Sequence, residues 1–191
     1  GKDAYDLILQ DAPDGPTDLF VLPHFSGSGT PTLDTQSRGA ILGLCFTSTK
    51  ASIAKAMLEG LTFELKINIE LLQNCGIRIN KLHAVGGGAK SDLWLHLKAD
   101  ICDLTLVVPK VTEAACLGAV ILAGVATGIY KDYDAAIGQI VSVKKTVEPN
   151  PVLSRQYDNY YRQYKKIYHA LRTINYRLND LKSDLVVIRK K

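Results

Sequence analysis

The chain has 191 residues, of which 47% are hydrophobic and 22% are charged, and its formal net charge at pH 7 is +4. This composition is typical of a globular domain with a real core, and it excludes a low-complexity or disordered chain. No apolar stretch reaches the length of a membrane span, and the start lacks a basic segment followed by an apolar one. We therefore expect a cytoplasmic protein with no membrane partner.

The distribution of charge argues against a nucleic-acid-binding protein, and the spacing of cysteine and histidine argues against a metal site or a disulfide framework. Much of the positive charge lies after residue 150, where acidic side chains are interleaved with lysine and arginine, so we expect a solvated helix face and no nucleic-acid partner. The cysteines lack CxxC spacing and the histidines lack metal-ligand spacing: Cys45, Cys75, Cys102, Cys116, His24, His83, His96 and His169. Neither a metal site nor a disulfide framework is indicated.

The first part of the chain predicts short elements followed by one long helix. In chain order we expect a surface helix or turn within 1–18, an apolar run at 19–22, a loop at 24–34, a strand at 38–44 and a helix at 50–72. The helix is indicated by apolar residues at three- and four-residue steps. The sequence Asn74-Cys75-Gly76 predicts its left-handed cap.

The second part alternates strands and helices. We expect strands at 81–85 and 105–108, helices at 91–102, 114–127 and 133–140, an extended link at 147–151 and a tyrosine-rich helix from 151 to beyond 175. Such alternation predicts an α/β fold with parallel strands covered by helices. Small residues along 114–127 predict that this helix packs unusually close to a neighbour, and the tyrosines of the last helix are expected to pack against the sheet or a partner chain.

A run of three glycines, Gly86-Gly87-Gly88, lies between a predicted strand and a predicted helix. Glycines permit a sharp turn at positive φ and let a flat ligand approach the main chain, while the following helix directs its free N–H groups at the turn. A nucleotide is the first ligand to consider. The run matches neither the GxGxxG fingerprint nor a P-loop, so a purely structural turn stays open on this motif alone.

Four segments, in this order, resemble the C-terminal half of the FGGY family of carbohydrate kinases. They are Leu22 to Leu44, the helix around Ala56-Met57-Leu58-Glu59-Gly60, the run from Gly86 to Asp100, and Thr112 to Val120. Two positions depart from the family pattern: Gly29 stands where many members carry a basic residue, and Ser52 stands where His, Asp, Asn or Gln is usual. The resemblance covers about residue 19 to about residue 171.

The resemblance implies an actin-like (ribonuclease H-like) ATPase fold with a mixed sheet flanked by helices. It implies ATP and Mg²⁺ as cofactors and a sugar or polyol as substrate. Residues 1–174 would be the C-terminal nucleotide-binding lobe, with its opening strands missing, and 175–191 a C-terminal extension. The N-terminal domain of the same polypeptide, which would carry the general-base aspartate, is not present in this chain. Kinases of this kind often dimerise, so a homodimer is one option.

By resemblance, Gly87, Gly88 and Ala89 would face the adenosine and α-phosphate, and Asp92 would contact adenine or ribose. For Asp92 the alternative is a helix N-terminal residue favoured by the dipole. Ser91 is predicted to be a local cap. No catalytic residue is assigned in this chain.

Other acidic residues receive structural interpretations. We interpret Glu59 and Asp100 as hydrogen-bonded helix carboxylates and Glu113 as an N-terminal charge. One further class stays open: a non-enzymatic, nucleotide-gated interaction module of the actin-like superfamily. A dinucleotide-binding domain is a third interpretation, but the chain lacks GxGxxG near a first strand and an acidic residue at the end of the second.

Overall fold

The computed structural model describes residues 4–188, which divide into two compact units. Unit 1 comprises residues 1–78 and 152–191, and unit 2 comprises residues 79–151. Within the described residues, none of the helices combines the length and the apolar character that crossing a membrane requires.

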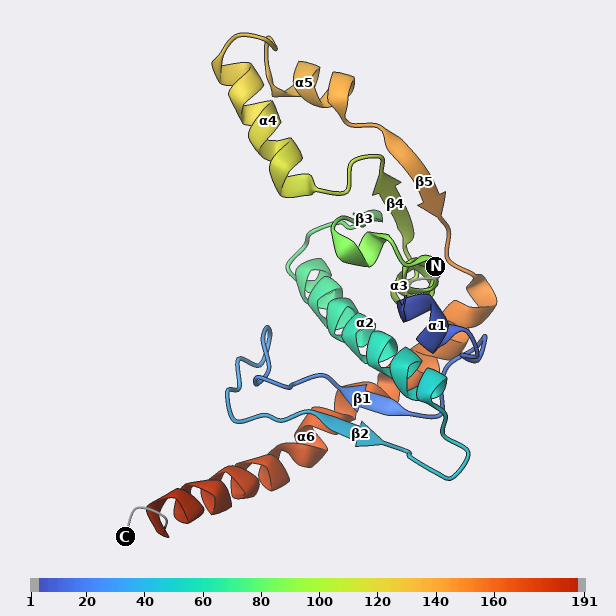
Figure 1. Cartoon of the computed structure of the whole chain (residues 1–191), viewed down its shortest axis with the longest axis vertical. Coiled ribbons are helices and arrows are strands. Elements are labelled where there is room, and N and C mark those ends of the chain that lie inside the picture. The colour runs from blue at the N-terminus through green and yellow to red at the C-terminus, as the bar shows by residue number, and fades with distance from the viewer. Residues whose placement is uncertain (1–3, 189–191) are drawn as a thin grey trace. The chain divides into compact units, whose positions relative to one another are not determined.

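Unit 1 is built on a pair of strands and two long helices (Figure 1). Its elements are α1 (Ala4–Leu9), β1 (Phe20–Leu22), β2 (Ala40–Leu42), α2 (Lys50–Asn74) and, from Val152 onward, α6 (Pro151–Ile188). Strand β1 pairs antiparallel with β2, with Val21 opposite Ile41. Helix α2 packs on β1 through its mid-helix glycine, Gly60, whose missing side chain leaves room for the Val21 carbonyl. The predicted cap after α2 is confirmed, since Gly76 has φ +86°.

Tyrosines of α6 pack against α2 and, as predicted from the sequence, against a strand: the ring centroid of Phe20 in β1 lies 5.9 Å from that of Tyr160. Tyr157, Tyr161 and Tyr164 are each 1% exposed. Their rings surround Phe63 of α2, whose ring centroid lies 4.9 Å from that of Tyr164. The hydroxyl of Tyr164 donates to Glu64 of α2 at 2.7 Å. The rings thus bury apolar area while their hydroxyls keep hydrogen-bond partners, which makes burial of a tyrosine favourable. Tyr157, Tyr161 and Tyr164 therefore belong to the core of unit 1.

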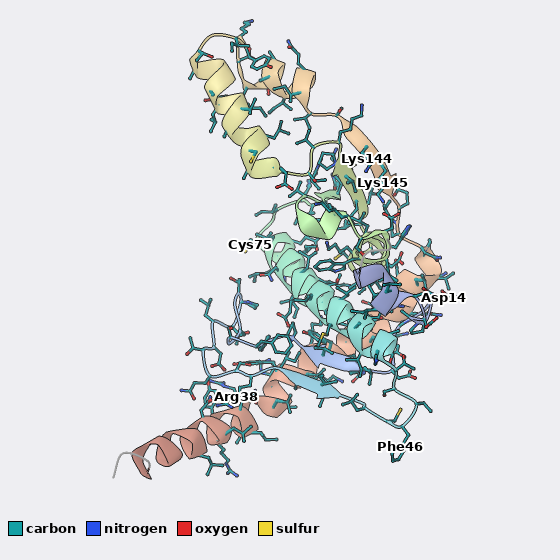
Figure 2. All side chains as sticks on the ribbon, viewed as in Figure 1. Asp14, Arg38, Phe46, Cys75, Lys144 and Lys145 are labelled. Carbon is teal, nitrogen blue, oxygen red and sulfur yellow. The ribbon has the colours of Figure 1, made fainter. Side chains whose placement is uncertain are left out.

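The loop predicted at 24–34 is fastened to the second half of α6. The Asp34 carboxylate accepts hydrogen bonds from the Tyr168 hydroxyl at 2.8 Å and the Tyr176 hydroxyl at 3.2 Å. Nearby, Arg38 donates to the Asn179 side chain, and Figure 2 labels Arg38 in this region of the unit. The domain boundary expected after residue 174 thus falls inside one continuous helix, and the division into 1–174 and 175–191 stays a prediction.

Unit 2 contains a mixed three-stranded sheet. Its elements are β3 (Lys81–His83), the 3₁₀ turn η1 (Gly87–Ala89), α3 (Asp92–Cys102), β4 (Thr105–Pro109), α4 (Ala114–Ala126), α5 (Tyr133–Ile140) and β5 (Val143–Val147). The strand order is β3-β4-β5, with β3 parallel to β4 and β5 antiparallel to β4. Helix α3 buries Leu95 and Ala99 in a cluster with Leu106 and Val108 of β4. The α/β class and the mixed sheet are confirmed.

The packing of α4 differs from the packing that its sequence predicts. Figure 1 shows α4 and α5 beside each other, beyond the sheet of unit 2. Gly124 is the buried residue of α4, and a Cβ there would lie 2.5 Å from the Tyr130 ring. Ala115 and Ala119 are exposed, and a Cβ at Gly118 would meet no atom within 4 Å. The close approach predicted for the whole helix is therefore wrong for this structure: it occurs only where the chain turns back at Tyr130.

Candidate nucleotide-binding site

The glycine turn follows β3 and precedes α3. Gly86 has φ +73° and ψ −164°, a conformation that side chains strongly disfavour and glycine adopts freely. Its amide donates to the Thr112 carbonyl at 2.8 Å, which joins the turn to the segment before α4. The start of the turn is thus fixed by the backbone conformation and the hydrogen bond of Gly86.

The main chain of the turn is open at Gly86 and Gly87, whereas the side chains of Trp94 and Lys98 lie next to Gly88. An added Cβ at Gly86 or Gly87 would meet no atom within 4 Å. Within residues 4–188, the amides of Gly87 and Gly88 donate to no protein acceptor, as is normal for the first N–H groups of a helical turn. These amides can therefore donate to a ligand lying on the turn.

Among the residues at the predicted nucleotide site, Ala89 and Ser91 stabilise the turn and the start of α3. Ala89 is 6% exposed, packs in the core cluster with Leu95, and donates its amide to the Gly86 carbonyl at 3.1 Å. Its methyl group anchors the turn to the sheet. The Ser91 hydroxyl accepts from the Trp94 amide at 3.3 Å, so the predicted cap of α3 is confirmed.

Asp92 is the first residue of α3, and its side chain is 77% exposed. It forms an ion pair with Lys145 of β5, which Figure 2 labels. The hydrogen bond from Lys145 holds the pKa of Asp92 below its ordinary value. A carboxylate at this position also suits the helix dipole, as the alternative interpretation expects. A contact between Asp92 and a nucleotide stays a prediction.

The sequence does not predict that the Lys98 ammonium lies next to the glycine turn. The Lys98 ammonium lies 3.9 Å from the centroid of the Trp94 ring. The two residues are four apart on α3, a spacing that brings side chains together on a helix and that could have signalled the pair. Burial lowers the pKa of Lys98.

Glu59 and Asp100 have hydrogen-bond partners, as interpreted from the sequence, whereas the Glu113 side chain makes no hydrogen bond that caps α4. Buried Glu59 accepts from Thr17 and Tyr157, and buried Asp100 accepts from the Asn150 amide at 2.7 Å. Glu113 precedes α4 as its N-terminal flanking residue. The described residues hold no cluster of three or more His, Cys, Asp or Glu suited to a metal ion.

The two residues that depart from the family pattern are Ser52, which caps a helix, and Gly29, which is exposed. Ser52 forms a capping box with Thr49 at the start of α2, each side chain accepting from the other residue's amide. Ser52 thus caps the helix N-terminus, as an Asp, Asn or Gln could at the third helical position. Gly29 is exposed, and an added Cβ would meet no atom within 4 Å.

Comparison with known proteins gives consistent matches. Residues 2–127 match the family model described as FGGY family of carbohydrate kinases, C-terminal domain. The chain is 35% identical to a xylulose kinase of Staphylococcus epidermidis over 81% of this chain and 31% of that protein. It is 38% identical to a glycerol kinase of Rhodopirellula baltica over 69% of this chain and 24% of that protein.

A solved structure agrees with these sequence matches. The ligand-bound xylulose kinase from Lactobacillus acidophilus superposes with a TM-score of 0.80 at 30% identity, covering 91% of this chain and 35% of that one. The chain therefore spans about a third or less of the length of the relatives it matches.

Proposed function

This chain belongs to the FGGY family of carbohydrate kinases, and from that premise we propose that it supplies the C-terminal ATP-binding lobe of a kinase that phosphorylates a sugar or polyol hydroxyl. The open glycine turn carries the proposal, because it combines free amides with space for a ligand. Xylulose and glycerol are the substrates named for the two relatives, and either class of acceptor fits the proposal.

The residues of the turn suit a nucleotide. The amides of Gly87 and Gly88 are the donors we assign to phosphate, and Asp92 is the residue we assign to ribose or adenine. Ala89 holds the turn in place through its burial. Bound ATP with Mg²⁺ would supply the transferable phosphoryl group and neutralise its charge. We propose no Mg²⁺ ligand and no general base from this chain.

The rest of the kinase is the partner that the proposal requires. A general base must reach the attacking hydroxyl, and we place it, with most of the sugar pocket, in the portion of the longer protein that precedes this lobe. Exposed apolar side chains support further packing: Val120 is 54%, Leu122 57% and Ile129 73% exposed in or just after α4. We place the kinase in the cytoplasm and leave a homodimer as an option.

We expect the 191-residue chain to bind ADP weakly, and the Gly87→Val variant to bind it at least about tenfold more weakly. The added side chain would occupy the open space over the turn and keep a ligand from the main chain, without a clash in the folded protein. Titration calorimetry with ADP and Mg²⁺ measures both affinities. No sugar turnover is expected from this chain alone.

The control is Gly29→Val, which adds the same side chain to open space in unit 1. It should leave ADP binding unchanged, and both variants should keep the thermal stability of the parent. Gly88→Val is a poorer test, since a Cβ there would lie 2.9 Å from the Trp94 ring and disturb α3. ADP binding that survives Gly87→Val would overturn the assignment of the nucleotide to the turn.

A further inference from the structure

Lys98 places its ammonium at the glycine turn although it lies nearly two turns along α3. Side chains on a helix lean toward its N-terminus, and the Lys98 stem follows that direction to bring Nζ over the Trp94 ring at 3.9 Å. The position of an added Cβ at Gly88 would lie 3.2 Å from the same Nζ. The ammonium thus borders the backbone that we assign to nucleotide phosphate.

Among the side chains that the structure describes, no carboxylate forms an ion pair with Lys98. The acidic residue at the start of the same helix, Asp92, pairs with Lys145 instead. Burial beside Trp94 lowers the pKa of Lys98, and an anion within reach would stabilise the charged form.

We propose that Lys98 is a phosphate-binding residue of this lobe, donating from Nζ to a phosphate oxygen of a nucleotide on the Gly87-Gly88 main chain. This inference rests on the proposed function. Trp94 positions the Lys98 ammonium by a cation–π contact, and the N–H groups of this ammonium can still donate to a phosphate oxygen. Lysine is a compact point charge on a flexible stem and suits a phosphate oxygen well.

The test compares Lys98→Met with Lys98→Arg, using ADP, adenosine and inorganic phosphate as probes in titration calorimetry. Methionine keeps an unbranched apolar stem against Trp94 and removes the charge. We expect Lys98→Met to weaken ADP binding about tenfold and to leave adenosine binding unchanged. Lys98→Arg should retain most of the ADP affinity because its charge is kept.

The control is Lys81→Met, which removes an exposed lysine at the start of β3, the end of that strand away from the glycine turn. It should leave the ADP affinity unchanged. Equal thermal stability of Lys98→Met and Lys81→Met would show that the Lys98 effect does not come from unfolding.

The outcomes separate this inference from the proposed function. If the parent chain binds neither ADP nor adenosine, the proposed function fails and Lys98 has no role in it. If the parent binds ADP but Lys98→Met binds it equally well, only the role of Lys98 fails. Equal loss of ADP and adenosine would make Lys98 a packing residue. Loss of inorganic phosphate binding with unchanged ADP binding would assign Lys98 to free phosphate and overturn the nucleotide contact.

Discussion

Gly60→Ala should lower the free energy of unfolding by about 3 kcal/mol, although alanine normally stabilises a helix interior by about 1 kcal/mol relative to glycine. The reason is the close approach of α2 to β1: a Cβ at Gly60 would lie 2.1 Å from the Val21 carbonyl oxygen. Backbone cannot move aside as a flexible side chain can, so α2 and β1 must separate. Urea denaturation followed by far-UV circular dichroism measures the change.

Gly118→Ala in α4 is the matched control. It is also a helix-interior glycine, but an added Cβ there would meet no atom within 4 Å. We expect it to leave stability unchanged or to raise it by up to about 1 kcal/mol. The free energy of unfolding should therefore fall in Gly60→Ala and stay unchanged or rise in Gly118→Ala. If Gly60→Ala were as stable as Gly118→Ala, the contact between α2 and β1 would be refuted.

Elements defined by local patterns were predictable from the sequence. The apolar spacing over 50–72 predicts α2, and the structure extends it only to Asn74. The glycines at 86–88 predict a turn between strand and helix, and Gly86 has the positive φ that such a turn requires. Both patterns are local, because they follow from backbone geometry and the 3.6-residue period. The family resemblance is confirmed by the match over residues 2–127.

The actin-like ATPase fold expected from that resemblance is confirmed as well. The solved xylulose kinase that superposes with a TM-score of 0.80 comes from the same kinase family. Strand β5, an antiparallel edge strand, completes the mixed sheet of unit 2. The sequence at 143–147 carries two lysines and no strict alternation, so its pairing depends on β4 rather than on its own pattern.

Features that depend on distant partners were not predictable. The spacing of Lys55 and Glu59 is visible in the sequence, but it does not say that both are 2% exposed or that Thr17 lies beside them. Ala89 could be placed on the turn, but not in the core of unit 2. Lys98 could be placed on α3, but its proximity to Gly88 depends on how the turn folds back. Tertiary packing decides each of these contacts.

Glu59→Ala should lower the free energy of unfolding by about 3–5 kcal/mol, because it breaks a buried polar cluster in unit 1. The Glu59 carboxylate accepts from the Thr17 amide at 3.1 Å and the Tyr157 hydroxyl at 3.0 Å, and it lies 4.0 Å from the Lys55 ammonium. Lys55 also donates to the Gly15 carbonyl at 2.6 Å, so the cluster ties the segment before β1 to α2. Urea denaturation at neutral pH measures the loss.

Glu59→Gln separates the charge from the hydrogen bonds. Its amide oxygen can still accept from Thr17 or Tyr157, so we expect a smaller loss than for Glu59→Ala. Burial raises the pKa of Glu59 above its ordinary value of 4.5. The folded protein therefore holds this proton more tightly than the unfolded chain. The stability that results is fully present below about pH 4.5 and is lost as the pH rises through the folded-state pKa.

Glutamine does not titrate. As the pH rises from below about 4.5 through the folded-state pKa of Glu59, the parent should therefore lose stability relative to Glu59→Gln. Carboxylates with lowered pKa values, such as Asp92 and Asp158, change stability with pH in the opposite direction. They are common to both proteins, so their effect cancels in the difference. A pH-independent difference would mean that the cluster, through Lys55 and Thr17, offsets the burial of Glu59 completely.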